Sequence, residues 1–246
     1  DLLTVFVFWE LMAIGSTLVL WSQGSEAAYR AARRYLMIHL AGGVLLFAGI
    51  TGHVVGTGSV AFTRMAPDSV AQALILAGFL VNAAALPLSA WLPDAYPEAS
   101  WSGTVFLSAF TTKAAVCVLM RGFPGTEMLV WLGLAMAFYG IVYALLEDDM
   151  RRLLAYAIVN QGGFMLAGVG LGTEMALNGV AAQAVTGVLY MALLLMTAGA
   201  VLAATGRRRC SELGGLFRAM PLTTGCAVIG ALSISSFPLT SGFVSK

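Results

Sequence analysis

Charged side chains are scarce in this sequence of 246 residues. Asp, Glu, Lys and Arg together make up 10% of it, whereas hydrophobic residues make up 59%. Soluble domains carry about 25% charged residues, so this chain lacks the polar surface that a soluble domain needs. The formal net charge is +1, without the basic excess of a nucleic-acid-binding protein. The composition predicts a protein of the lipid bilayer with no nucleic-acid partner.

Cysteine is also rare. The three cysteines, Cys117, Cys210 and Cys226, are odd in number and lack CxxC spacing. This argues against a disulfide framework, a zinc site or an iron–sulfur cluster. The sequence also lacks a glycine-rich dinucleotide-binding loop. We therefore expect no bound metal or cofactor and no soluble catalytic site.

Long apolar runs are abundant. A membrane-spanning helix needs about 20 mainly apolar residues. Scanning for such runs predicts an all-α membrane protein with about eight transmembrane helices in a single domain over 1–246. The predicted segments are 2–21, 35–55, 70–91, 101–120, 128–146, 153–171, 175–204 and 217–244. The chain begins with Asp1 rather than Met and ends at Lys246 directly after an apolar run, so we expect a segment of a longer protein.

The distribution of arginine predicts the topology, because short cytoplasmic loops are enriched in basic residues. The loops after the second, fourth and sixth segments hold only Arg64 and Arg121. The loops after the first, fifth and seventh segments hold the rest, namely Arg30, Arg33, Arg34, Arg151, Arg152, Arg207, Arg208, Arg209 and Arg218. An eight-segment count places these three loops, and the loop after the third segment, on one side.

Four ionisable residues lie within or at the end of apolar runs: Glu10, His39, Lys113 and Lys246. A charge at the bilayer centre costs about 2.5–3.5 kcal/mol on insertion scales, so such residues usually face a protein interior or a water path. For Glu10 the alternative is a structural ion pair, and for Lys113 it is a side chain that extends to the membrane surface. For His39 the alternative is a hydrogen bond to a nearby carbonyl.

Two segments contain a proline deep in an apolar run, Pro87 in 70–91 and Pro238 in 217–244. Proline removes a helical hydrogen bond, and the freed carbonyls need partners in protein or water. The two segments lie five apart, so they cross the membrane in opposite directions. This predicts two discontinuous helices in an inverted repeat, with approximate half-repeats 1–122 and 123–246. Ordinary proline kinks are the alternative.

Several motifs together resemble one known family. They are Phe8-Trp9-Glu10-Leu11-Met12, Gly78-Phe79-Leu80-Val81, Trp91-Leu92-Pro93-Asp94-Ala95-Tyr96, and the stretch from Asp149 to Tyr156 followed by Gln161-Gly162. The set is similar to the proton-conducting antiporter-like family, which includes the A and D subunits of Mrp-type sodium/proton antiporters and the L, M and N subunits of respiratory complex I. The stretch around WLPDAYPEASWSGTV looks more like the antiporter D branch.

The resemblance implies a proton path through the membrane. Glu10 matches the family's glutamate, Lys113 a buried lysine, and Lys246 the basic residue after the second broken helix. Two positions depart from the family. Asn82 stands where a lysine that pairs with the glutamate is common, and Gly187 and Met191 stand where a histidine and a lysine are frequent.

The predicted path therefore comprises Glu10, Asn82, Lys113 and Lys246. Asn82 can hydrogen-bond Glu10 or hold a water, and His39 is an accessory residue that could substitute as a titrating group. These assignments follow from the resemblance and from the rarity of ionisable groups in apolar helices.

Three interpretations stay open. The first is a proton-translocating subunit, with sodium/proton antiport as its form in the Mrp branch. The second is a proton-pumping subunit of an NADH:quinone oxidoreductase-type complex, whose redox chemistry would belong to other subunits. The third is a structural paralogue that lost two lysines. All three imply partner subunits in a membrane complex, with the bacterial plasma membrane as the expected location, and a transporter subunit rather than an enzyme by itself.

Overall fold

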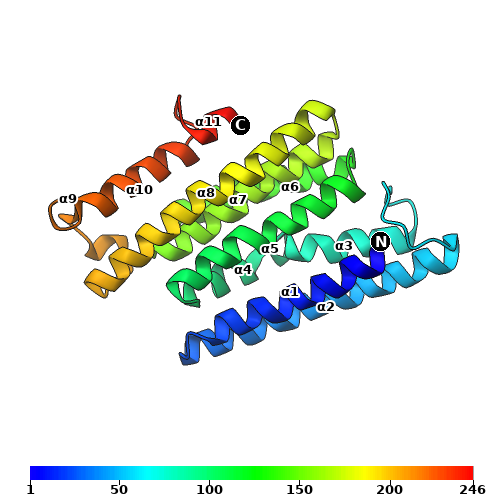
Figure 1. The fold of residues 1–246 in the computed structure, drawn as a ribbon, viewed down its shortest axis with the longest axis horizontal. Coiled ribbons are helices and arrows are strands. Elements are labelled where there is room, and N and C mark those ends of the chain that lie inside the picture. The colour runs from blue at the N-terminus through cyan, green and yellow to red at the C-terminus, as the bar shows by residue number, and fades with distance from the viewer. Residues whose placement is uncertain (246) are drawn as a thin grey trace.

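The computed structural model describes residues 1–245, which form a bundle of helices lying side by side (Figure 1). Within this range, six helices are long and apolar enough to cross a membrane. They are α1 (Leu2–Trp21), α2 (Glu26–Thr57), α5 (Trp101–Gly122), α6 (Glu127–Leu146), α7 (Met150–Leu171) and α8 (Glu174–Thr205). Two shorter apolar helices, α3 (Val70–Asn82) and α10 (Pro221–Ile234), begin the two interrupted segments. The predicted all-α membrane fold is confirmed.

The second helix starts earlier than its apolar run. Ser25 caps α2 by accepting a hydrogen bond from the backbone N–H of Ala28 at 3.1 Å, and the helix then continues through Arg30 and Arg33. A serine cap can start a helix ahead of its membrane-spanning part, whereas a hydropathy scan detects only the apolar part. The predicted start at residue 35 was therefore too late.

Both predicted helix interruptions are present. After α3 the chain continues as η1 (Leu88–Ala90), α4 (Trp91–Ala95) and η2 (Tyr96–Glu98); after α10 it continues as α11 (Ser241–Ser245). Pro87 and Pro238 lie within the two interruptions. Ala84 and Ser236, with φ of 56° and 59°, adopt the left-handed conformation, which strains a residue that has a side chain. These are breaks rather than proline kinks, and α3 and α10 run in opposite directions (Figure 1). The boundary between the half-repeats stays a prediction.

The loops that were expected on one side of the membrane meet there. Arg208, which lies between α8 and η3 (Cys210–Glu212), pairs with Glu98 of η2 at 3.0 Å and also with Asp149, the cap of α7. Arg34 of α2 pairs with Asp94 of α4 at 3.2 Å. Three inter-helix connections therefore come together with α2, and a short helix, α9 (Leu216–Ala219), leads from there into α10.

The opposite side is held by two arginines that bind backbone oxygens. Arg64 donates to the carbonyl oxygen of Pro124 at 3.1 Å, and Arg121 donates to that of Phe62 at 3.4 Å. These bonds join the connection between α2 and α3 to the end of α5 and the loop after it. The alternation of the connections between the two sides agrees with the predicted topology.

Small residues bring α2 and α3 into close contact. A side chain at Gly49 would meet the backbone nitrogen of Ile75 at 2.6 Å, and one at Gly78 would meet Cβ of Leu46 at 2.7 Å. Glycine permits such close approach of membrane helices. The packing fixes the end of α3, where Asn82 lies, against the middle of α2.

Candidate functional site

Glu10 projects from α1 onto α2. Its carboxylate occupies the space where a side chain at Gly43 would begin. The residue is half-buried, and its Oε1 atom is buried without a hydrogen-bond partner among residues 1–245. The neighbouring Trp9 packs on Phe79 of α3, with ring centroids 5.1 Å apart. The Glu10 carboxylate is thus placed against α2, and the neighbouring Trp9 contacts α3.

His39 lies on α2 one helical turn before Gly43 and is 1% exposed. Its Nδ1 is 2.9 Å from the carbonyl oxygen of Tyr35. A hydrogen bond to a nearby carbonyl was the predicted alternative to a functional role for this residue. The imidazole also stacks on the Tyr35 ring and contacts the Trp91 ring edge-on, with centroid distances of 3.8 and 4.6 Å. Its second nitrogen, Nε2, is buried and unpaired within the described part of the chain.

Asn82 is the last residue of α3 before the interruption and is 1% exposed. The indole of Trp91 donates to the carbonyl oxygen of the preceding Val81 at 3.1 Å, so Trp91 satisfies a carbonyl beside the break. Both polar side-chain atoms of Asn82 are buried and find no hydrogen-bond partner in residues 1–245. A direct hydrogen bond between Asn82 and Glu10, one of the predicted options, is therefore not formed.

Lys113 is buried in the middle of α5, with 8% of its surface exposed. Its ammonium donates to the carbonyl oxygen of Ser108 on the same helix at 2.7 Å. Over residues 1–245, no carboxylate lies within ion-pair distance of this ammonium. The side chain thus stays inside the bundle, and extension to the membrane surface is not what the structure shows.

Tyr35 connects the His39 region with α5. Its hydroxyl lies close to the side chains of Ser16 on α1 and Thr111 on α5, and it forms no hydrogen bond among residues 1–245. Thr111 lies two residues before Lys113 in the same helix. Glu10 and His39 therefore lie on the same face of α2, Trp91 connects His39 to the end of α3 beside Asn82, and Tyr35 reaches α5.

Lys246, the last predicted site residue, lies outside the described residues. The preceding Ser245, on α11, takes part in a polar network that the sequence analysis missed. Ser245 donates to Oε1 of Gln183 at 2.7 Å and accepts from Thr186 at 2.9 Å. This network ties the second half of the second interrupted helix to α8.

The network continues from α8 into α7. Gln183 donates through Nε2 to Oε1 of Gln161 and to the hydroxyl of Tyr190, both at 2.7 Å. Tyr190 also donates to Gln161 at 3.1 Å. All three residues are buried, so this neutral cluster lies beside Gly187, in the region of α8 where the resemblance implies titratable residues.

Arg151 has a structural position that arginine counting did not reveal. It lies in the first turn of α7, is 6% exposed, and reaches the loop behind the first interrupted helix. There its Nη2 donates to the carbonyl oxygen of Ala99 at 2.9 Å and contacts the hydroxyl of Thr104. A guanidinium with several fixed donors suits this task, so Arg151 fastens α7 to the chain after the break.

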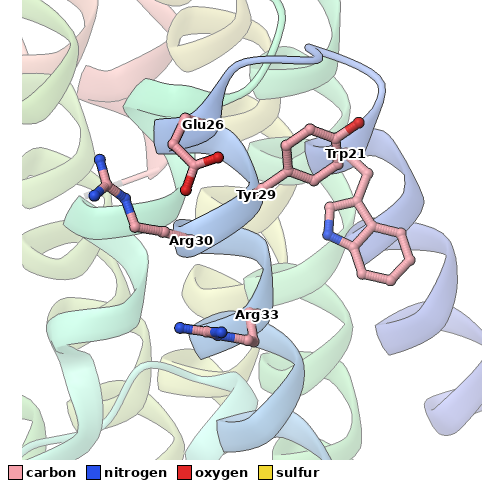
Figure 2. Close-up of a pocket in the computed structure, with 5 residues that line it drawn as sticks. All are labelled: Trp21, Glu26, Tyr29, Arg30 and Arg33. Atoms are coloured by element: carbon pink, nitrogen blue, oxygen red, sulfur yellow. The ribbon is translucent and has the colours of Figure 1, made fainter.

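A surface pocket lies apart from these residues, where α1 gives way to α2. It is lined by Trp21, Glu26, Tyr29, Arg30 and Arg33 (Figure 2). Figure 2 shows the two arginines along α2 and both aromatic side chains at the end of the helix pair. Tryptophan, tyrosine and arginine are typical of the boundary between a membrane and cytoplasm. Among residues 1–245, no three His, Cys, Asp or Glu side chains gather as a metal site would need.

The chain has relatives in both branches of the family that its motifs resemble. It is 32% identical to the N subunit of the NADH-quinone oxidoreductase of Desulforudis audaxviator, covering 100% of this chain and 53% of the relative. It is 28% identical to the D subunit of the Na(+)/H(+) antiporter of Alkalihalophilus pseudofirmus, covering 100% of this chain and 54% of that protein. The chain thus spans about half the length of these relatives, and the preference for the antiporter D branch stays a prediction.

The fold has a close structural counterpart. A chain in the structure of the Mrp complex from Dietzia sp. DQ12-45-1b superposes with a TM-score of 0.93 at 29% identity, over 100% of this chain and 49% of that one. The sequence model of the family described as NADH:quinone oxidoreductase/Mrp antiporter, TM, matches residues 1–246. Together with the interrupted helices, the half-buried Glu10 and the buried Lys113, this match establishes that the chain is an integral, multi-pass membrane protein belonging to the NADH:quinone oxidoreductase/Mrp antiporter transmembrane family.

Proposed function

We propose that this chain is the proton-translocating core of a membrane subunit, with a path through Glu10, Asn82, Lys113 and Lys246. The observation that carries the proposal is the burial of Lys113 in mid-helix with a backbone carbonyl as its partner. An ionisable group at this depth costs about 2.5–3.5 kcal/mol on insertion scales and is usually functional. A lysine without a permanent acid partner can release its proton and bind it again.

The geometry around Glu10 supports the same role. Its carboxylate lies over a glycine of α2, and its Oε1 atom and the side-chain amide of Asn82 are both buried and unpaired in the described part of the molecule. Buried polar groups of this kind are normally satisfied by ordered water. Asn82 then acts as a water-holding residue at the position where the family resemblance would place a lysine.

The partners and the ion follow from the relatives and are part of the proposal. The similar proteins are named as subunits of a sodium/proton antiporter and of an NADH-quinone oxidoreductase. We propose that the chain works beside other membrane subunits in a bacterial plasma membrane and exchanges protons for sodium. The alternative is a respiratory complex, in which electron transfer by other subunits drives the protons.

The test is proton flux in vesicles that contain the full-length protein in its complex. Glu10→Ala and Lys113→Ala should each reduce the flux by about tenfold or more, the effect of losing a proton-transfer group that contributes about 10²–10⁴-fold. Glu26→Ala, which removes an exposed carboxylate at the surface pocket, is the matched control and should leave the flux unchanged. Wild-type flux in both Glu10→Ala and Lys113→Ala would refute the path.

A further inference from the structure

The departure at Asn82 leaves Glu10 without the lysine that the family resemblance assigns to it. A switch based on moving charge needs a second titratable group near the carboxylate. The helix α3, which carries Asn82, has no ionisable side chain between Val70 and Asn82. The second group must therefore come from another helix.

His39 has the position that this role requires. It lies four residues before Gly43 on α2, so it occupies the same helix face, about 6 Å along the helix axis from the residue under the Glu10 carboxylate. Its ring contacts Trp91, whose indole holds the carbonyl of Val81 next to Asn82. The imidazole thus lies between the glutamate and the break in the first interrupted helix.

The hydrogen bond of His39 fixes which nitrogen can take up a proton. Nδ1 is 2.9 Å from the carbonyl oxygen of Tyr35, and a carbonyl only accepts hydrogen bonds, so Nδ1 carries the proton of the neutral ring. The lone pair is then on Nε2. This atom is buried and, in the described residues, unpaired, as is Oε1 of Glu10.

We propose that His39 is the titratable partner of Glu10 and that a bound water joins its Nε2 to the carboxylate. A proton that leaves Glu10 passes through the water to Nε2 and forms an imidazolium; its return restores neutral His39 and protonated Glu10. This inference rests on the proposed proton path. It assigns to His39 on α2 the role that a lysine at position 82 would have.

The other carboxylates near His39 are already paired with arginines, so Glu10 is the acid that can exchange a proton with it. On α4 and η2, Asp94 is paired with Arg34 at 3.2 Å, and Glu98 is paired with Arg208 at 3.0 Å. Tyr96 of η2 donates its hydroxyl proton to the carbonyl oxygen of Leu107 at 2.9 Å.

One further group completes the surroundings of His39. Tyr35, on α2 itself, stacks on the imidazole, and its buried hydroxyl lies close to Ser16 and Thr111 without forming a hydrogen bond among residues 1–245. Tyr35 thereby connects the surroundings of His39 to α5.

The experiment compares His39→Gln with His53→Gln in the full-length complex in vesicles. His53 lies on the same helix and is half-buried near its other end, so it is the matched control. A titrating relay group shapes the pH profile of the flux through its own protonation equilibrium, so wild type and His53→Gln should share one pH profile. His39→Gln should change this profile and reduce flux by about tenfold or more.

Tyr35→Phe provides a second variant that keeps the ring stacked on His39. It removes the hydroxyl near Ser16 and Thr111 but leaves the backbone carbonyl that binds Nδ1. The wild-type pH profile should remain in Tyr35→Phe, because His39 keeps its bond to the backbone carbonyl of residue 35. Thermal unfolding of each variant shows whether it is folded.

Three results overturn the inference. Wild-type flux and pH dependence in a folded His39→Gln, while Glu10→Ala is inactive, would refute the role of His39 and leave the proton path intact. Reduced flux with an unchanged pH profile in His39→Gln would show a purely structural histidine. Wild-type flux in both Glu10→Ala and Lys113→Ala would refute the path and the inference together.

Discussion

The carboxylate of Glu10 occupies the position where a side chain of Gly43 would begin, so the acid of α1 and the glycine of α2 form one complementary contact. The smallest residue on α2 thereby allows an ionisable group to enter the helix junction. His39 and Tyr35 continue the same face of α2. The position of the proposed proton path thus depends on a residue that has no side chain.

Gly43→Ala should therefore impair transport without unfolding the protein. The added methyl group would overlap the carboxylate, and the flexible end of Glu10 would move away from the junction. A misplacement of about 1 Å can reduce a rate by about 100-fold. Proton flux in vesicles measures the effect, and Gly56→Ala on the same helix is the control, because an added Cβ there meets no atom within 4 Å. Equal flux in the two variants would contradict the proposed position of the Glu10 carboxylate over Gly43.

Arg151→Met should destabilise the fold near the first interrupted helix. The substitution removes the donor to Ala99 and leaves a buried backbone carbonyl without its partner, at about 1–3 kcal/mol. Thermal unfolding of the detergent-solubilised protein should show a lower Tm. Arg152→Met is the control, since Arg152 pairs with Glu147 at 3.4 Å and its side chain is 41% exposed, and such pairs contribute about 0–1 kcal/mol. A smaller decrease in Tm for Arg151→Met than for Arg152→Met would contradict a stabilising role of the buried hydrogen bond between Arg151 and Ala99.

Gln183→Leu should loosen α11. The substitution keeps the approximate size of the side chain but removes the groups that bind Gln161, Tyr190 and Ser245. Each unpaired buried polar group costs about 1–3 kcal/mol, so the Tm should fall and amide exchange in α11 should speed up. Gln72→Leu is the control because its hydrogen bond with Ser69 is exposed. Unchanged exchange in α11 would argue against the network as its anchor.

Ser211→Ala should change the acid stability of the loop after α6. Hydrogen bonds from the hydroxyl and then the backbone N–H of Ser211 hold the pKa of Asp148 below its usual value of 3.8. A depressed folded-state pKa adds stability that is present above the ordinary pKa and disappears as pH falls through the folded value. The Tm difference between wild type and Ser211→Ala should therefore be constant at neutral pH and shrink below about pH 3.8. A Tm difference between wild type and Ser211→Ala that increases as the pH falls would contradict this prediction.

The sequence predicts the bundle and part of the site for physical reasons. Glu10 and Lys113 are detectable because an ionisable residue interrupts an otherwise apolar helix, and the two breaks are detectable because proline removes a helical hydrogen bond. The cluster of Gln161, Gln183 and Tyr190 was missed. Neutral amides and hydroxyls barely change hydropathy, and their pairing depends on how α7 packs against α8.

Arg151 illustrates a second limit. Its position between two apolar runs indicates topology, but a count of arginines carries no information about hydrogen bonds. In the structure the same residue is buried and holds the carbonyl of Ala99. The partner lies in a loop distant in sequence, so only the packed fold reveals it.

The central claim is that the natural chain conducts protons although Asn82 replaces a lysine. The most direct measurement is proton flux in vesicles containing the full-length complex, compared between wild type, Asn82→Lys and Glu10→Ala. We predict clear flux in wild type and its loss in Glu10→Ala, because the path already has its titratable groups. Flux that is absent in wild type and arises only in Asn82→Lys would contradict the account and identify the natural chain as a structural subunit.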